Sequence, residues 1–564
     1  MNKEFIDSIY EQNQTTQGRE NLYKRLETIE EANWKNIKEK NISNWTEIFT
    51  QQAKTYASKT VIKEVETGDY FTYQELEDAS NSVMKFILAT TQEHQLGINY
   101  HNSFDFMATL IGINKAGRLA ILFNNREPNQ RLESLAQSSE TKIVFGNAIK
   151  GLKHIKIREV IENKKIQKNL FLKKFTSIEE PAFVIFTSGT SGPSKPALFS
   201  HKRMIGAGVA WSLRTGMDSR DSCYISLPLY HGNALAVAFS SVIYSGATAI
   251  LRPKFSVRAF WNDINKYNCS HMVYIGELWR YLLNNKSPSN PNKSLKVIFG
   301  NGLNHTLWKS VRDTYKIEHV VEHFGATEMP SGALTNWMNI IGYCGYLPLE
   351  DVRVQEMVLV DENFKSVEKE ENGEALFLVP SREYRGYLDK TLDAPKLHRN
   401  LFDKDDVWWK SGDLLKVNSE GFYTFVERLG DTYRFKGENV ACVDVENAIR
   451  ESGNFEEVVV YGVELPNIEG KVGMASLVSK ELFTTKEANE LLKNLKYKLA
   501  NHALPHILRI QTEKHVTTST LKIQKAYLAK EALKNISECK HYYLLNLDNG
   551  YKILESEITL GVKS

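Results

Sequence analysis

The segment from Ala182 to Arg203 constrains the fold of this chain more than any other. It begins with the run Phe183-Val184-Ile185-Phe186, whose β-branched and aromatic residues predict a buried strand. Two glycines, a proline and several hydroxyl residues then follow between Thr187 and Lys195, and such a sequence cannot continue a strand. The segment therefore predicts a buried strand that ends in a glycine-rich loop.

The composition of this loop suits a phosphate chain. Glycines let backbone N–H groups approach phosphate oxygens, hydroxyls add donors, and Lys195 adds a positive charge. The residues expected to contact phosphate are Thr187, Ser188, Gly189, Thr190, Ser191, Gly192 and Lys195. The loop is not of the Gly-x-x-x-x-Gly-Lys-Ser/Thr type, because it lacks the Gly-Lys-Ser/Thr triplet. A Ser/Gly-rich surface turn would have a similar composition, so this loop alone does not establish a function.

Length and composition limit the class of protein. A chain of 564 residues is too long for one core, so we expect at least two domains. The net charge of +3 is too small to predict nucleic-acid binding. The five cysteines are scattered and never in CxxC spacing, which favours a reducing cytosol over a disulfide framework or a zinc site. The N-terminus has no apolar core, so no signal peptide is expected.

Hydrophobic patterns predict alternating helices and short strands, which is the α/β signature. Residues 1 to about 50 predict polar helices with Trp34 and Trp45 as docking anchors. Thr72 and Glu75 form a capping box ahead of an apolar-periodic segment, and a long helix is predicted from 486 to 502. The most apolar window, 234–251, contains serines, a glycine and a threonine, so it predicts a buried helix running into a strand rather than a membrane span.

Lysines are frequent between residues 155 and 175, including Lys164, Lys165, Lys168, Lys173 and Lys174. They indicate either a solvated helix face or a surface that contacts a membrane, and we favour the solvated face. Peripheral contact with the inner face of a membrane stays open at this point, and the sequence gives no indication of the oligomeric state.

A second polar segment, Glu322 to Glu328, reads EHFGATE. The ring of Phe324, followed by Gly325, can stack on a base, and Thr327 can donate to a phosphate. The carboxylate of Glu328 can hold Mg²⁺ against phosphate oxygens, because this cation prefers oxygen ligands. A turn that caps a helix would also account for this string when it is taken alone.

Further candidates follow other predicted strands. His231 follows a strand, and the run Gly300-Asn301-Gly302 would let a flat ring lie against the backbone. Asp413, in the string KSGDL, offers a carboxylate that can accept hydrogen bonds from two hydroxyls at once. Arg428 begins another polar, glycine-bearing passage.

Taken together, the strings TSGTSGPSK, EHFGATE, KSGDL and TLKIQK resemble, in this order, the motifs of the adenylate-forming enzymes, which include acyl-CoA synthetases, luciferases and adenylation domains. FSVRAFWNDINKYN, YIGELWRYLL and GDTYRFKGENV are most similar to the fatty-acid transport protein and very-long-chain acyl-CoA synthetase group. The resemblance runs from about Asn44 to the end of the chain. Four departures are Pro193-Ser194 in place of Leu-Pro, Ser411 in place of Thr, Ser519 in place of Gly, and no N-terminal membrane segment.

This resemblance implies an α/β fold with a large multi-sheet N-terminal domain, residues 1–429, and a small, mobile α+β C-terminal domain, residues 430–564. It implies that Lys522 is the lysine that promotes adenylation and that Gly430 is the hinge. The other implied roles are a phosphate contact for Thr327, a magnesium ligand for Glu328, an acyl-pocket border for His231, ribose contacts for Asp413 and Arg428, and a thioester-forming face at Lys436 and Gly437.

The implied activity is that of an ATP-dependent ligase. It joins a long or very long fatty acid to coenzyme A (CoA) through an acyl-adenylate, releasing AMP and pyrophosphate, with Mg²⁺ as cofactor. Two alternatives remain. One is a CoA ligase for a bile-acid-like, carnitine-like or aromatic carboxylate. The other is a lipid-uptake or lipid-binding protein with residual ligase chemistry.

Overall fold

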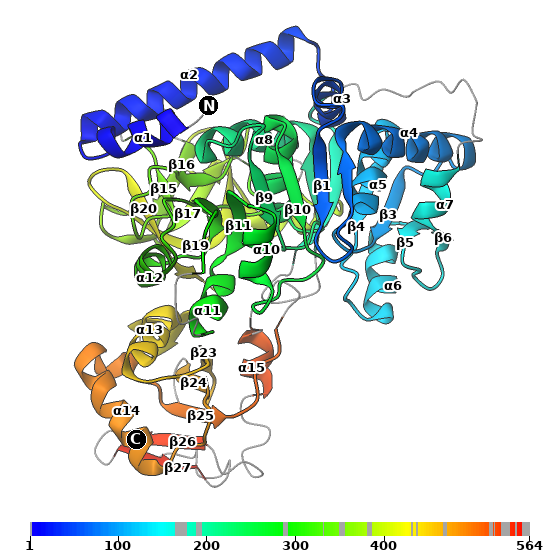
Figure 1. Cartoon of the computed structure of the whole chain (residues 1–564). Helices are drawn as coiled ribbons and strands as arrows, with labels where there is room; N and C mark the ends of the chain where they lie inside the picture. Colours follow the sequence, from blue (N-terminus) through cyan, green and yellow to red (C-terminus); the bar gives the residue numbers. More distant parts are fainter. Residues whose placement is uncertain are drawn as a thin grey trace.

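The structure, a computed structural model, describes residues 3–163, 177–187, 195–285, 291–330, 332–348, 356–380, 386–429, 432–435, 438–465, 471–517, 523, 525–531, 542–546 and 550–554. Figure 1 shows a large part that contains three sheets and a smaller part, below it, that is built from the C-terminal residues. Each part has its own cluster of buried hydrophobic residues, and the C-terminal cluster extends from Tyr433 to Leu554. The α/β fold class with a large and a small domain is therefore confirmed.

The largest sheet has eight strands and is parallel except at its two edge strands. In spatial order its strands are β14 (Leu334–Asn336), β13 (His319–Phe324), β12 (Val297–Asn301), β11 (His271–Ile275), β9 (Ser222–Ile225), β10 (Thr248–Leu251), β1 (Thr60–Glu64) and β2 (Tyr70–Thr72). The window 234–251 forms a π-helix, η1 (Asn233–Phe239), then α9 (Ser240–Ser245) and β10, as predicted for a buried helix that runs into a strand. Among the described residues, no helix combines the length and hydropathy that a membrane crossing requires.

A second sheet carries the strand predicted from Phe183 to Phe186. In spatial order it contains β6 (Lys153–Ile155), β5 (Ile143–Gly146), β3 (Gln95–Asn99), β4 (Leu119–Leu122), β7 (Pro181–Thr187) and β8 (Lys195–Ser200). Strands β7 and β8 are antiparallel, and Thr187 lies opposite Lys195. The glycine-rich segment therefore connects the two strands of a hairpin, and its ends are fixed by the sheet.

The remaining strands belong to a third, antiparallel sheet of the large part and to the C-terminal part. The third sheet orders β15 (Gly345–Tyr346), β20 (Phe422–Arg428), β19 (Val407–Val417), β17 (Asn372–Leu378) and β16 (Met357–Val360), with β18 (Leu397–Arg399) beside β19. The C-terminal sheet orders β23 (Glu457–Val463), β24 (Val472–Val478), β25 (Ile507–Gln511), β26 (Tyr542–Asn546) and β27 (Gly550–Ile553), and β21 (Thr432–Phe435) pairs with β22 (Glu438–Ala441).

Helices cover these sheets. They are α3 (Trp45–Thr55), α4 (Tyr73–Thr90), α5 (Phe104–Lys115), α6 (Asn129–Ser138), α7 (Ile157–Glu162), α8 (His201–Thr215), α10 (Phe260–Lys266), α11 (Gly276–Asn284), α12 (His305–Tyr315), α13 (Cys442–Ser452), α14 (Thr485–Lys498) and α15 (Lys525–Glu531). The predicted capping box of Thr72 and Glu75 starts α4. The prediction for 486–502 was wrong at its C-terminal end: Leu499 is extended, and its N–H bonds to Leu495 O, which closes α14. The helical spacing of leucines includes Leu499, but the backbone leaves the helix after Lys498, so the spacing overestimated the length of the helix.

The N-terminal helices α1 (Lys3–Gln12) and α2 (Thr16–Glu39) lie across the top of the large part (Figure 1). Arg19 forms an ion pair with Glu420 at 3.2 Å, and Glu30 forms one with Arg214 at 2.5 Å. Trp45 is buried and donates to Asn114 Oδ1 at 2.7 Å, as expected for a docking anchor. The ion pair between Glu30 and Arg214 places α2 against α8.

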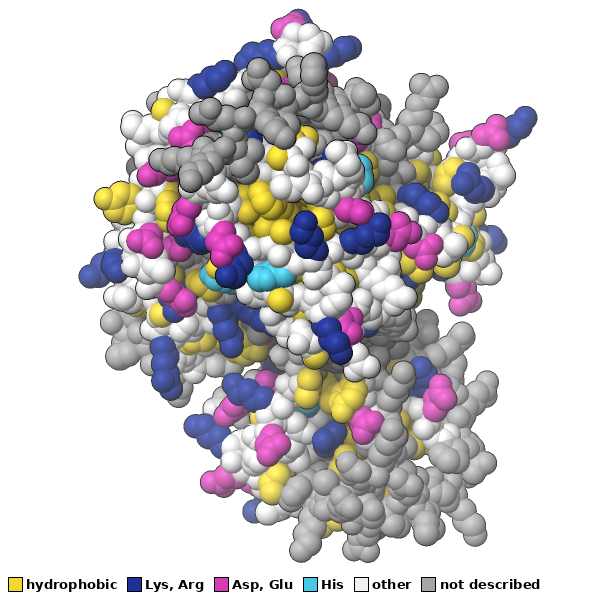
Figure 2. Space-filling model, turned by 90° about the vertical axis from the view of Figure 1, so that its right-hand side faces the viewer, with side chains coloured by type: hydrophobic (Ala, Val, Ile, Leu, Met, Phe, Trp, Pro, Cys, Tyr) yellow, Lys and Arg dark blue, Asp and Glu magenta, His cyan; other side chains and the backbone are white. Residues whose placement is uncertain are grey.

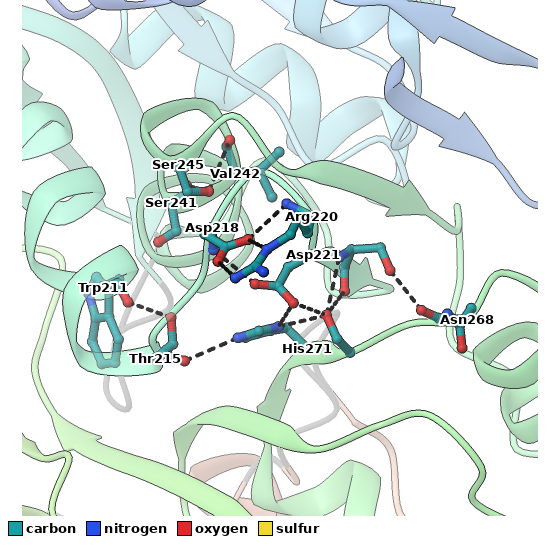
Figure 3. Close-up of polar contacts among 12 residues, drawn as sticks. Trp211, Thr215, Asp218, Arg220, Asp221, Ser241, Val242, Ser245, Asn268 and His271 are labelled. Carbon is teal, nitrogen blue, oxygen red and sulfur yellow. Dashed lines mark hydrogen bonds and ion pairs between the residues drawn. The ribbon is translucent and has the colours of Figure 1, made fainter. Parts of the chain in front are cut away.

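Polar side chains fix the C-terminal end of α8 to the large sheet (Figure 3). The ring of the buried His271 lies with Nε2 3.1 Å from the carbonyl oxygen of Thr215, the last residue of α8. The hydroxyl of Ser270 donates to Asp221 Oδ1 at 2.9 Å. Helix α8 ends at Gly216, which has a φ of +65° that favours glycine. Helix α8 is therefore held at the end that lies next to α2.

Candidate functional site

Most of the predicted site residues that the structure describes line one cleft of about 2920 Å³. It is lined by residues from all three sheets of the large part, and by residues of the C-terminal part such as Glu446, Arg450 and Lys525. Of the predicted residues, the cleft is lined by Thr187, Lys195, His231, Asn301, Gly302, Phe324, Gly325, Thr327, Glu328, Asp413 and Arg428.

Glu328 lines this cleft and lies four residues after β13 ends. Its Oε1 accepts hydrogen bonds from the hydroxyls of Thr187 and Tyr387, each at 2.8 Å. The ammonium group of Lys195 lies 5.6 Å from the centre of the Tyr387 ring. Within the described part of the chain, Oε2 of Glu328 has no hydrogen-bond partner. One carboxylate oxygen is thus held in place, and the other can bind a cation.

This carboxylate fits the expected magnesium ion. Mg²⁺ in nucleotide sites keeps several waters and takes only one or two protein carboxylates, with substrate phosphates supplying further oxygens. Among the described residues, no group of three or more His, Cys, Asp or Glu side chains could form an all-protein metal site. A single oriented ligand such as Glu328 therefore suits a metal that arrives with a nucleotide.

Asp413 and Arg428 lie opposite each other on the neighbouring strands β19 and β20. Their side chains form an ion pair, with Arg428 Nε 3.2 Å from Asp413 Oδ1. Nearby, Lys396 Nζ donates to the Ser411 carbonyl at 3.0 Å. Burial lowers the pKa of Lys396 and Arg428 lowers it further, against the opposing effects of Glu328 and Asp413. This corner of the cleft combines a carboxylate with two cations.

Aromatic rings form the wall next to these charges. The ring of Phe324 is nearly parallel to the rings of Phe377 and Phe425, with centroid distances of 6.2 and 6.1 Å. Phe324 is only 7% exposed, whereas Phe425 is 44% exposed and also lines the cleft. The more accessible aromatic surface at this point is therefore that of Phe425, which the sequence did not single out.

Only two residues of the predicted run Gly300-Asn301-Gly302 line the cleft. Asn301 and Gly302 line it, and Asn233 Nδ2 donates to Asn301 Oδ1 at 2.8 Å. Gly300 is buried within the sheet, where an added Cβ would lie 2.1 Å from the Tyr274 carbonyl oxygen. Gly300 stands where β11 and β12 approach too closely for a side chain, and it does not line the cleft, so its contact with a ligand stays a prediction.

A buried carboxylate supports this turn from behind. Glu322 Oε1 accepts the backbone N–H groups of Gly302 and Leu303, the latter at 3.0 Å, and the Tyr274 hydroxyl donates to Oε2. Burial raises the pKa of Glu322 to about 8, although these three hydrogen bonds oppose the rise. Gly302 has a φ of +99°, a conformation that favours glycine. The carboxyl group thus fixes the turn that borders the cleft.

His231 lies at the border of the cleft, edge-on to the ring of Tyr230 with 4.7 Å between the ring centroids. The predicted residues Ser188, Gly189, Thr190, Ser191, Gly192, Gly430, Lys436, Gly437 and Lys522 lie outside the described residues. Ile523 and Lys525, which follow Lys522 in the sequence, line the cleft.

Besides Phe425, the structure adds three residues that the sequence did not indicate. Tyr387 donates to Glu328, Lys396 lies beside Asp413 and Arg428, and Arg203 Nη1 donates to the Thr327 carbonyl at 2.6 Å. None of them lies in a glycine-rich or acidic string, and nothing local distinguishes Tyr387 among 25 tyrosines. Only the folded arrangement brings them to the site.

Comparisons with known proteins agree with this geometry. The sequence profile described as "AMP-binding enzyme" matches residues 49–388, which is more than half of the chain. A medium/long-chain-fatty-acid–CoA ligase of Mycobacterium tuberculosis, FadD6, is 30% identical over 89% of this chain and 88% of its own length. The long-chain fatty acid transport protein 2 of Rattus norvegicus is 34% identical over 67% of this chain, and the alignment spans 63% of that relative's length.

Solved structures agree on the fold. The O-succinylbenzoate coenzyme A synthetase of Bacillus subtilis, in complex with ATP and a magnesium ion, matches with a TM-score of 0.73 and 20% identity, covering 86% of this chain and 99% of that one. ATP-bound MatB from Rhodopseudomonas palustris matches with a TM-score of 0.75 and 18% identity, covering 88% and 100%. At these identities the matches establish the fold alone.

Proposed function

Because the chain belongs to the AMP-binding enzyme family, we propose that it joins a medium- to very-long-chain fatty acid to CoA in two steps, through an acyl-adenylate. The single observation that carries the proposal is the Glu328 carboxylate, held by Thr187 and Tyr387 in the cleft. The mycobacterial relative, whose name states a medium- or long-chain fatty acid and CoA, supports this choice of substrates.

In the first step, a carboxylate oxygen of the fatty acid attacks the α-phosphorus of ATP. The new bond joins that oxygen to phosphorus, and the bond to pyrophosphate breaks, so the electron pair leaves with pyrophosphate. A carboxylate and a triphosphate repel each other, so the site must supply positive charge and fixed orientation. Lys195 and Arg428 line the cleft and would supply charge, and Thr187 would orient Glu328.

Mg²⁺, when bound at Glu328 together with ATP, would neutralise phosphate charge. The positions of other residues in the cleft support further contacts with the nucleotide. Asp413, mostly buried and already oriented by Arg428, would accept from the ribose hydroxyls. Phe324 and Phe425 offer aromatic surface for the adenine ring, and Thr327 would donate to the α-phosphate.

In the second step, the thiol of CoA attacks the acyl carbon, the bond from that carbon to the AMP oxygen breaks, and AMP leaves. The thiol proton passes to solvent. The mixed anhydride is already electrophilic, so this step needs no nucleophile from the protein. We propose that the boundary between residues 1–429 and 430–564 is where the C-terminal domain rotates between the two steps, withdrawing Lys522 and bringing Lys436 and Gly437 to the site.

The first experiment measures AMP release by the purified protein with ATP, Mg²⁺ and CoA and a panel of fatty, bile-acid-like, carnitine-like and aromatic carboxylates. We expect release that needs both CoA and a fatty acid, and that falls in Lys522→Ala and Glu328→Gln. An exposed variant, Glu362→Gln, is the matched control. Release with another class of acid alone would replace the substrate. Absence of release from a protein that binds fatty acid and co-sediments with lipid vesicles would favour a lipid-binding role.

A further inference from the structure

We propose that His515 is a positioning residue for the first step of the reaction, because it fixes one side of the segment that carries Lys522. This inference rests on the proposed function, in which Lys522 promotes the attack on ATP. Residues 518–522 lie outside the described residues, whereas Thr517 and Ile523 on either side of them are described. Contacts on both sides attach this segment to the C-terminal domain.

His515 is buried behind strand β25 and is held by three hydrogen bonds. Its backbone N–H donates to Glu457 Oε2 at 2.9 Å, and its ring Nδ1 lies 2.8 Å from the same oxygen. Its other ring nitrogen, Nε2, lies 2.8 Å from the hydroxyl oxygen of Ser476. Glu457 and Ser476 belong to the neighbouring strands β23 and β24. His515 is therefore clamped to two strands of the C-terminal sheet.

The charge of Glu457 strengthens this clamp. Burial raises the pKa of the Glu457 carboxyl, but its hydrogen bonds to His515 outweigh burial, and the pKa lies below its ordinary value. A carboxylate can only accept, so Nδ1 of His515 donates to it, and Nε2 of the neutral ring accepts from Ser476. Hydrogen bonds to an ionised group are roughly twice as strong as those between neutral groups.

The other side of the segment is attached to the same domain. Ile523 pairs with Thr517 in an isolated antiparallel bridge, which joins the two sides of the segment. Lys525 Nζ lies 2.9 Å from Oε1 of Glu446 on α13, and the same oxygen accepts the N–H of Val460 at 3.0 Å. The five residues between Thr517 and Ile523 are therefore connected on both sides to the body of the C-terminal domain.

His515 does not face the cleft. His515, Glu457 and Ser476 do not line it, whereas Lys514 and Ile523 do. His515 can therefore affect the reaction only through the placement of the segment next to it. Displacement of a reacting group by about 1 Å can lower a rate about a hundredfold. Loss of the clamp should impair the step that uses Lys522 and spare the step from which Lys522 is withdrawn.

The experiment compares His515→Ala with Asn489→Ala in the full chain. Asn489 is the matched control, because its three hydrogen bonds, with Thr485 and Tyr551, join α14 to β27 in the same domain. The first step is measured as pyrophosphate release from ATP and hexadecanoic acid without CoA. The second step is measured as acyl-CoA formation from supplied hexadecanoyl-adenylate and CoA.

We expect His515→Ala to lower the first rate by about ten- to a hundredfold and to leave the second close to that of the wild type. His515→Asn, whose amide nitrogen can still donate to Glu457, should recover most of the first rate. Equal loss of both steps in His515→Ala, or the same selective loss in Asn489→Ala, would overturn the proposal. If His515→Ala does not fold, Ser476→Ala removes the hydroxyl at Nε2 and leaves Glu457 paired, and it should show a several-fold loss confined to the first step.

Hydrogen–deuterium exchange separates the clamp from the ligase. Peptides that cover residues 512–517 and 523–528 should exchange faster in His515→Ala than in Asn489→Ala or the wild type. If the wild type formed no acyl-adenylate but this difference in exchange were present, the proposed function would fail and the clamp would stand. If exchange did not depend on His515, the clamp would fail whatever the activity.

Discussion

Glu322 makes the stability of this protein depend on pH in a direction opposite to that of most carboxylates. Its pKa is raised by burial from 4.5 to about 8. Between these values the folded protein keeps a proton that the unfolded chain releases, so the free energy of unfolding falls as pH rises. The contribution is fully present below the unfolded pKa and is lost as pH rises through about 8. At about 1.4 kcal/mol per pKa unit, the total is on the order of 5 kcal/mol.

Glu322→Gln removes the titration and keeps the packing. The amide oxygen can still accept the N–H groups of Gly302 and Leu303, and the Tyr274 hydroxyl can accept from the amide nitrogen. Urea unfolding at about pH 5 and about pH 8 should therefore show the variant gaining stability relative to wild type by a few kcal/mol as pH rises. The exposed Glu362→Gln should show no such gain. A difference between Glu322→Gln and wild type that stays constant with pH would refute the reasoning.

Two further predictions follow from contacts around the cleft. Gly300→Ala should lower the free energy of unfolding by about 1–3 kcal/mol, because its Cβ would lie 2.1 Å from the Tyr274 carbonyl oxygen. The control Gly332→Ala, which has open space around it, should keep the melting temperature of the wild type. Equal melting temperatures of the two variants would contradict this prediction. Tyr387→Phe removes one of the two hydrogen-bond donors to Glu328 and should reduce kcat/KM for AMP release about tenfold. The melting temperature of this variant should stay close to that of the wild type. Full activity of the variant would show that this donor does not orient the carboxylate.

Local features of the sequence predicted much of the fold. The strand from Phe183 to Phe186 and the capping box at Thr72 depend on residues near one another in the chain, and both are present. The predicted end of the helix at 502 was wrong, because the helical spacing of leucines does not indicate that the backbone becomes extended at Leu499. A sequence pattern within one helix or strand predicts that the element forms, but it predicts less well at which residue the element ends.

Much of the candidate site was not readable from local patterns. Tyr387 and Glu328 are 59 positions apart, and the hydrogen bond between them arises only when the segment around Tyr387 pairs with Ala197 of β8. The raised pKa of Glu322 depends on burial, which its polar string did not predict. On the face shown in Figure 2, lysine and arginine side chains lie among aspartate and glutamate. The solvated face expected for the lysine-rich segment 155–175 stays a prediction, because its residues 164–175 lie outside the described residues.

The central claim is that a carboxylate oxygen of the acid attacks the α-phosphorus of ATP. The most direct test supplies a fatty acid whose carboxylate carries heavy oxygen, together with ATP, Mg²⁺ and CoA, and follows the label by mass spectrometry. The account predicts one heavy oxygen in the AMP that is released and one in the acyl-CoA thioester. Label in inorganic phosphate with formation of ADP, or AMP without label, would contradict it.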